Sequence, residues 1–160
     1  MSYPAIEPYA TRRLPVALPH VLYVEECGNP LGLPVVVLHG GPGSSCRPHH
    51  RTLFDPGFYR ILLFDQRGSG RSEPRGWVRR NRTPDLIDDL ERIRRAFGVD
   101  RWLLFGGSWG ATLALLYAQA HPEAVLGLVL RGVFLARPRD LDWFFGADGV
   151  ARVFPEAWQS

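Results

Sequence analysis

The chain has 160 residues, a formal net charge of +3, 46% hydrophobic residues and 22% charged residues, which suits one globular domain with its own core. Lysine is absent, and most of the arginines are interleaved with acidic residues. We therefore expect no continuous basic face for nucleic acid. The one basic run, 79–82, is interpreted as a solvated loop. We expect a cytoplasmic protein without metal, cofactor or membrane segment. No apolar run could span a bilayer, residues 1–19 show neither the apolar region nor the cleavage site of a signal peptide, and Cys27 and Cys46 lack metal-ligand spacing.

Apolar runs predict the elements in chain order. Alternation predicts a strand at 20–26, and continuous apolar runs predict buried strands at 34–38, 60–64, 101–105 and 125–130. Helices are expected at 48–53, 83–97, 109–120, 141–145 and 150–154. Thr83 is expected to cap the second of these helices, with Pro84 in its first turn. Strands that alternate with helices predict an α/β fold with a doubly wound, mostly parallel sheet.

Three glycine-rich segments, 40–43, 68–70 and 106–110, each follow a predicted strand. In such sheets ligands bind at the carboxyl ends of the strands, so we expect the three segments to meet at one edge. The third segment, Gly106-Gly107-Ser108-Trp109-Gly110, lies between a strand and a helix, which is the context of a hydrolase nucleophile. Ser108 is therefore a candidate nucleophile at a helix N-terminus; the alternative is a serine that only fits a tight turn.

Three motifs in this order carry a resemblance to a known family: His39-Gly40-Gly41-Pro42-Gly43, Asp65-Gln66-Arg67-Gly68-Ser69-Gly70-Arg71-Ser72 and the Ser108 segment. Together they resemble the proline iminopeptidases, a family of α/β-hydrolases. The segments 25–30 and 130–134 are also similar, and the resemblance extends from Tyr3 to Trp158. It implies an α/β-hydrolase fold and a serine peptidase that releases N-terminal proline from peptides by acyl transfer.

The resemblance also implies roles for individual residues. Ser108 would be the nucleophile, and the backbone N–H groups of Gly41 and Trp109 would form the oxyanion hole. The residues expected to shape the site are His39, Gly40, Gly43, Gly107 and Gly110.

Three side chains near these motifs allow alternative interpretations. His39 is expected to brace the oxyanion loop, since a general base needs reach and an orienting carboxylate. Asp65 is expected to tie down its own turn together with Arg67. The Trp109 ring could wall the site for a proline ring or simply pack against apolar neighbours.

The family's catalytic Asp and His have no matching positions. In this fold they follow the serine in the order Asp or Glu, then His, and His121 is the only histidine after Ser108. A helix would separate the two residues by about 20 Å, too far for a base. The resemblance implies an α/β-hydrolase core at 1–136 and the beginning of a helical cap at 137–160, truncated before the last strands and most of the cap.

We therefore expect the chain to be inactive alone. The open alternatives are another α/β-hydrolase acting on esters or amides, or a non-catalytic fragment. The oligomeric state is not predicted.

Overall fold

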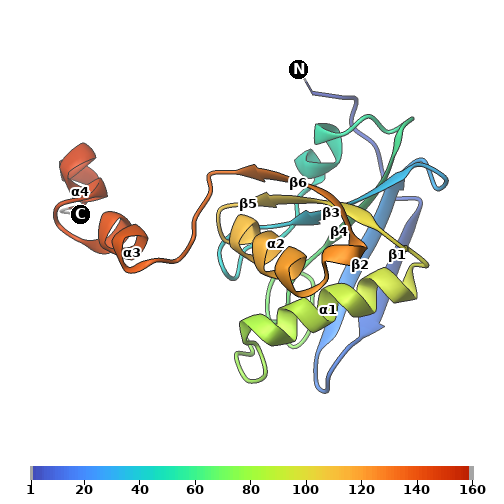
Figure 1. Ribbon diagram of the computed structural model, residues 1–160, viewed down its shortest axis with the longest axis horizontal. Helices are drawn as coiled ribbons and strands as arrows, with labels where there is room; N and C mark the ends of the chain where they lie inside the picture. Colours follow the sequence, from blue (N-terminus) through green and yellow to red (C-terminus); the bar gives the residue numbers. More distant parts are fainter. Residues whose placement is uncertain (1, 159–160) are drawn as a thin grey trace.

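The computed structural model describes residues 2–158, and six of its segments form one sheet. The strands are β1 Ala10–Pro15, β2 Val21–Gly28, β3 Leu33–Leu38, β4 Tyr59–Phe64, β5 Trp102–Gly107 and β6 Val125–Arg131. Their order is β1-β2-β4-β3-β5-β6 (Figure 1). β1 and β2 are antiparallel to their neighbours, whereas β4, β3, β5 and β6 are parallel to one another. The predicted α/β fold with a mostly parallel sheet is confirmed.

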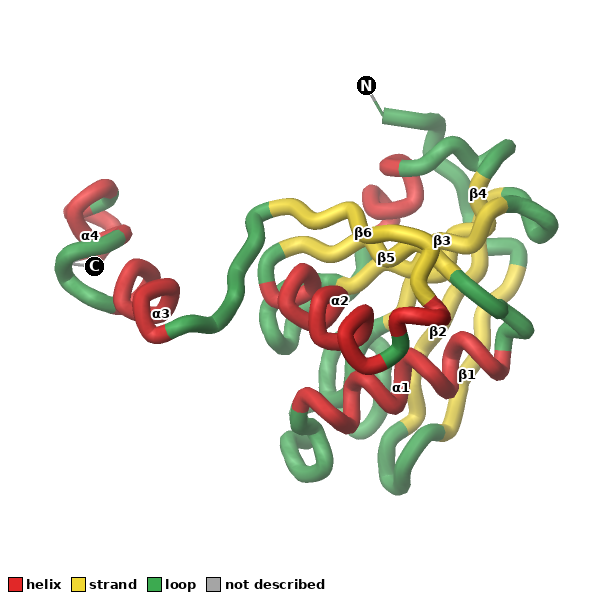
Figure 2. Tube along the Cα trace, viewed as in Figure 1, coloured by secondary structure: helices red, strands yellow, loops and turns green. Residues whose placement is uncertain are grey.

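The helices lie between and after these strands. They are α1 Thr83–Ala96, α2 Trp109–Ala120, α3 Pro138–Phe145, α4 Val150–Val153 and α5 Pro155–Trp158, with short 3-10 helices η1 Pro48–Leu53 and η2 Pro122–Ala124. α1 and α2 lie side by side on one face of the sheet (Figures 1 and 2). The segment after β6 leads away from the sheet to α3 and α4. The division into a core at 1–136 and a cap at 137–160 stays a prediction.

The central strands β3, β4 and β5 are largely apolar because both faces of the sheet are covered; Arg60 at the start of β4 is an exception and pairs with Glu26 on β2. Val36 and its neighbours on adjacent strands pack toward α1 and α2, where Leu90 and Leu113 meet them. Val35 and Val37 point to the opposite face and pack with residues near η1. Side chains alternate along a strand, so a strand buried on both faces has few polar positions. This explains why continuous apolar runs predicted β3, β4 and β5. The prediction that the strand at 125–130 is buried was wrong, because β6 lies at an edge of the sheet and is largely exposed.

Some local predictions were wrong. β1 was not predicted, because its sequence is largely polar and exposed; it is an edge strand that, within residues 2–158, pairs only with β2. Thr83 is not the cap of α1. Arg82 holds that position, and its backbone N–H donates to the Asp85 carboxylate over 2.9 Å. α5 was also missed.

Two further observations bear on the compartment. Cys27 and Cys46 are both buried and free. No helix in residues 2–158 has the length and apolar character needed to cross a bilayer. Location in the cytoplasm remains a prediction.

We expect the purified chain to self-associate through β6. Within the described residues this strand pairs only with β5, and Leu126, Leu128 and Val129 on it are exposed. An unpaired apolar edge is a template for another strand. Light scattering should show oligomers at tens of micromolar, and Leu128→Lys should reduce them. Leu31→Lys, at an exposed turn, is the control and should change nothing. A monomeric wild type would contradict the prediction.

Candidate active site

Ser108 lies in a sharp turn between β5 and α2. Its φ of 56° and ψ of −122° are unusual for a residue with a side chain, and such a conformation costs on the order of 1–3 kcal/mol. The turn is held by the Ser108 N–H, which donates to the Arg131 carbonyl over 3.1 Å. Gly110 is required because a Cβ there would overlap the Leu38 carbonyl oxygen on β3. The Ser108 side chain is thereby left exposed at the carboxyl end of β5.

The loop after β3 approaches the serine closely. Gly41 has φ +119°, and a Cβ there would lie 2.6 Å from the Gly43 nitrogen. A Cβ on Gly40 would lie 3.4 Å from the Ser108 Cβ, so glycine allows the loop to pass beside the serine. Among residues 2–158, the backbone N–H groups of Gly41 and Trp109 have no hydrogen-bond partner. Both groups are therefore free to bind an oxygen atom.

The cavities divide the predicted site residues into two sets. A cavity of about 310 Å³ contains Ser108 together with His39, Gly40, Gly41 and Gly107. Gly43 and Trp109 instead line a neighbouring cavity of about 740 Å³. Gly110 is buried beneath the turn.

The Trp109 ring does not wall either of the cavities that contain Ser108. It packs against the apolar core cluster that includes Leu86 and Leu113. Its indole Nε1–H donates to the Gln66 side-chain oxygen over 3.1 Å. Of the two roles expected from the sequence, the structure favours packing, and it adds an anchoring hydrogen bond that was not predicted.

His39 has both ring nitrogens engaged. Nδ1 is 2.9 Å from the Gly40 carbonyl, to which it donates, and Nε2 accepts the Gln66 backbone N–H over 2.9 Å. Burial lowers the pKa of His39, which favours this neutral form. A ring fixed in this way can brace the loop, and it has no free nitrogen with which to take the Ser108 proton.

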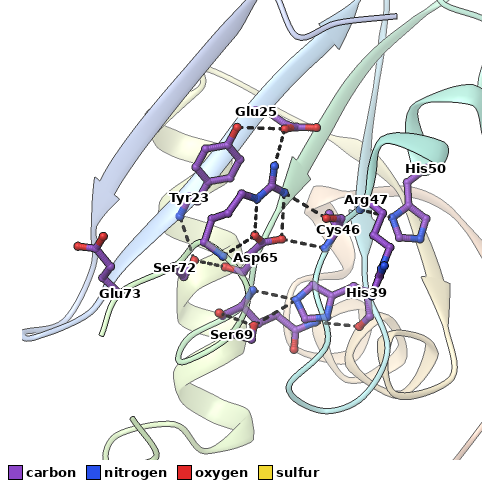
Figure 3. Close-up of polar contacts among 12 residues, drawn as sticks. Tyr23, Glu25, His39, Cys46, Arg47, His50, Asp65, Ser69, Ser72 and Glu73 are labelled. Atoms are coloured by element: carbon purple, nitrogen blue, oxygen red, sulfur yellow. Dashed lines mark hydrogen bonds and ion pairs between the residues drawn. The ribbon is translucent and has the colours of Figure 1, made fainter. Parts of the chain in front are cut away.

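Asp65 ties its turn to the loop that carries Gly41 (Figure 3). Its carboxylate accepts the Cys46 N–H over 2.8 Å and pairs with the Arg71 guanidinium over 2.7 Å. The prediction that Arg67 is the partner of Asp65 is wrong. The Arg67 side chain pairs with Asp89 on α1. The chain reverses direction after Arg67, and this brings Arg71 back to Asp65.

Sequence reasoning missed three side chains around the site. Gln66 and Arg71 belong to a motif that was recognised, but nothing in their spacing indicates their partners. The Arg131 guanidinium packs against Gly107, where a Cβ would lie 3.2 Å from its Nε. The only sequence signal for Arg131 was its place in a segment similar to the family.

His121 lies at the end of α2 opposite Ser108. Its Nδ1 is 3.6 Å from the Glu123 carboxylate, and its backbone N–H donates to the Tyr117 carbonyl. In residues 2–158 no histidine donates to or accepts from the Ser108 hydroxyl. The described residues thus present a serine and two free N–H groups, and the serine has no hydrogen-bonded base, although His49 and His50 line the same cavity.

Acid should destabilise the fold through His39 and His50. Burial lowers the pKa of both, that of His50 from 6.5 to about 4, with His49 and Arg131 adding repulsion. Below pH 6.5 the unfolded chain therefore binds more protons than the folded one, and stability falls until about pH 4. We expect a loss on the order of 1–3 kcal/mol across this window in urea unfolding. His50→Gln should flatten the decrease more than His49→Gln does; a pH-independent wild type would contradict this.

This geometry of strand, strained serine, helix and adjacent glycine loop defines an α/β-hydrolase. The chain belongs to the alpha/beta hydrolase fold family, whose model matches residues 34–160. Within that family it resembles the proline iminopeptidases. It is 55% identical over 157 residues to the proline iminopeptidase of Xanthomonas citri, covering 98% of this chain and 50% of the relative. The resemblance expected from the motifs is confirmed.

Solved structures agree on the fold. The proline iminopeptidase-related protein of Thermus thermophilus superposes with a TM-score of 0.66 at 35% identity, covering 76% of this chain and 43% of that one. A Vigna radiata epoxide hydrolase mutant reaches 0.71 at 26% identity, covering 91% and 47%. The chain spans about half the length of the curated relatives it matches.

Proposed function

We propose that this chain carries the nucleophile and oxyanion hole of a serine peptidase that removes N-terminal proline from peptides. The Ser108 oxygen attacks the carbonyl carbon of the proline residue, and the Gly41 and Trp109 N–H groups stabilise the oxyanion. The peptide C–N bond then breaks, and the serine proton passes through a base to the leaving amine, which leaves proline as an ester on Ser108. Water then attacks this ester, releases proline and restores the serine hydroxyl. The exposed hydroxyl of Ser108 beside two unpartnered N–H groups is the observation that carries this proposal.

The choice of substrate is supported by a small cavity beside the serine. A space of about 100 Å³ is lined by Gly41, Ser108, Phe134, Phe144 and Phe145. The Phe134 and Phe144 rings meet edge to face at 5.8 Å. An aromatic wall of this size suits a compact apolar ring better than a charged side chain. The names of the relatives point to the same substrate, and we propose cytoplasmic peptides as its source.

The chain assayed alone is expected to turn over proline anilide no faster than its Ser108→Ala variant. The reason is that no base is hydrogen-bonded to Ser108 in the described residues, since a triad without its base retains only residual catalysis. Ser108-dependent turnover by the 160-residue chain at the rate of the Xanthomonas citri enzyme would contradict this.

The test of the function uses a fusion protein, in which residues 1–160 precede the part of the Xanthomonas citri relative that this chain does not match. The fusion should release proline from proline anilide in preference to leucine anilide. Circular dichroism checks that it is folded. Preference for a p-nitrophenyl ester over every amino-acid anilide would favour the esterase alternative and overturn the peptidase assignment.

A further inference from the structure

Gln66 lies buried between the two elements that carry the free N–H groups. Its side-chain Nε2–H donates to the His39 carbonyl over 2.9 Å, and its Oε1 accepts the Trp109 indole N–H over 3.1 Å. Its backbone N–H donates to the His39 ring, and its carbonyl accepts the Ser69 hydroxyl over 2.7 Å. Only 3% of the residue is exposed. Both polar atoms of the side-chain amide are therefore occupied.

These bonds join the two halves of the oxyanion hole. His39 is two residues before Gly41, so a fixed His39 carbonyl restrains the loop that presents the Gly41 N–H. Trp109 follows Ser108 directly, so an anchored indole restrains the first turn of α2. We propose that Gln66 is a positioning residue that sets the distance between the Gly41 and Trp109 donors. This inference rests on the proposed function.

The other end of this loop, at Cys46, is held by different residues, so Gln66 holds only the end that carries Gly41. Asp65 accepts the Cys46 N–H, and Arg71 donates to the Cys46 carbonyl over 3.2 Å. The loop between β3 and η1 is thus fixed at Cys46 by one pair and at His39 by Gln66. Without Gln66, the loop would stay attached, but the Gly41 end would lose its link to α2.

The effect on catalysis can be separated from the effect on stability. An apolar side chain of similar length could fill the space of Gln66, but it would leave the His39 carbonyl and the Trp109 indole N–H without these partners and so lower stability. For catalysis the placement of the two donors matters, because a shift of about 1 Å at a reacting centre can cost about 10²-fold in rate. The effect on donor geometry is therefore measured in variants that remain folded.

The first test measures donor geometry directly, by NMR of the 160-residue chain carrying Leu128→Lys to limit association. Gln66→Met should move the Gly41 and Trp109 amide resonances and make the Trp109 indole proton exchange faster. Gln66→Glu keeps the acceptor for the indole but removes the donor to His39, so mainly Gly41 should move. Gln119→Met, exposed on α2, is the matched control. Unchanged Gly41 and Trp109 amides in Gln66→Met would overturn the proposal.

The second test measures the fusion protein. Gln66→Met should lower kcat about 10²-fold with little change in KM, and its effect should not add to that of Trp109→Phe. A rise in KM alone, or full additivity, would overturn the positioning role. If the unmodified fusion lacks Ser108-dependent activity, the proposed function fails, whereas the amide resonances still decide whether Gln66 sets the geometry.

Discussion

Replacing Ser108 by alanine in the fusion protein is expected to lower kcat for proline anilide by about 10⁶-fold. The alanine keeps the turn between β5 and α2 but removes the hydroxyl oxygen that would form the acyl intermediate. The remaining activity would come from substrate binding and the Gly41 and Trp109 donors. Initial rates across a substrate series separate kcat from KM, and KM should change little.

His121→Ala is the matched control, because His121 is the only histidine after β5 in this chain that could be mistaken for part of a triad. It lies at the far end of α2 and contacts Glu123, so kcat should stay within about 2-fold of wild type. Circular dichroism confirms that both variants are folded. Equal losses in Ser108→Ala and His121→Ala would refute the assignment of the nucleophile.

Arg67→Leu is expected to cost about 3–5 kcal/mol in the free energy of unfolding. Arg67 and Asp89 form a bidentate pair at 2.5 and 2.7 Å, and each side chain is only 1% exposed. Removing the guanidinium leaves a carboxylate buried without its partner. The pair also holds the turn after β4 against α1, so the loss includes that contact. Urea unfolding of the 160-residue chain measures the effect.

Arg82→Leu supplies the comparison for this second prediction. Arg82 pairs with Asp85 at 3.5 Å, but its side chain is 83% exposed, so its removal should cost less than about 1 kcal/mol. The double variant Arg67→Leu, Asp89→Leu should regain part of the lost stability, since no charge stays buried. If Arg67→Leu and Arg82→Leu are equally stable, the buried pair does not hold the turn.

The amino-acid sequence by itself determined the elements that rest on local patterns. The central strands were predictable because burial on both faces favours apolar residues at most positions, and the bounds predicted for α2 agree with the structure. The turn at Ser108 was predictable because glycines on both sides lack a Cβ and so allow the close backbone approach that a sharp turn between strand and helix requires. The family resemblance followed from the same short motifs, because their residues determine local backbone conformation and do not depend on contacts with distant parts of the chain.

Only the tertiary structure decided which distant side chains meet. Asp65 pairs with Arg71 and Arg67 with Asp89, although Arg67 is nearer to Asp65 in sequence. β1 forms because β2 offers it an edge, and its own residues carry no strand pattern. The link from Gln66 to Trp109 joins residues 43 positions apart. Ion pairs and amide bonds depend on where the chain returns after each turn, and local residue patterns do not encode that path.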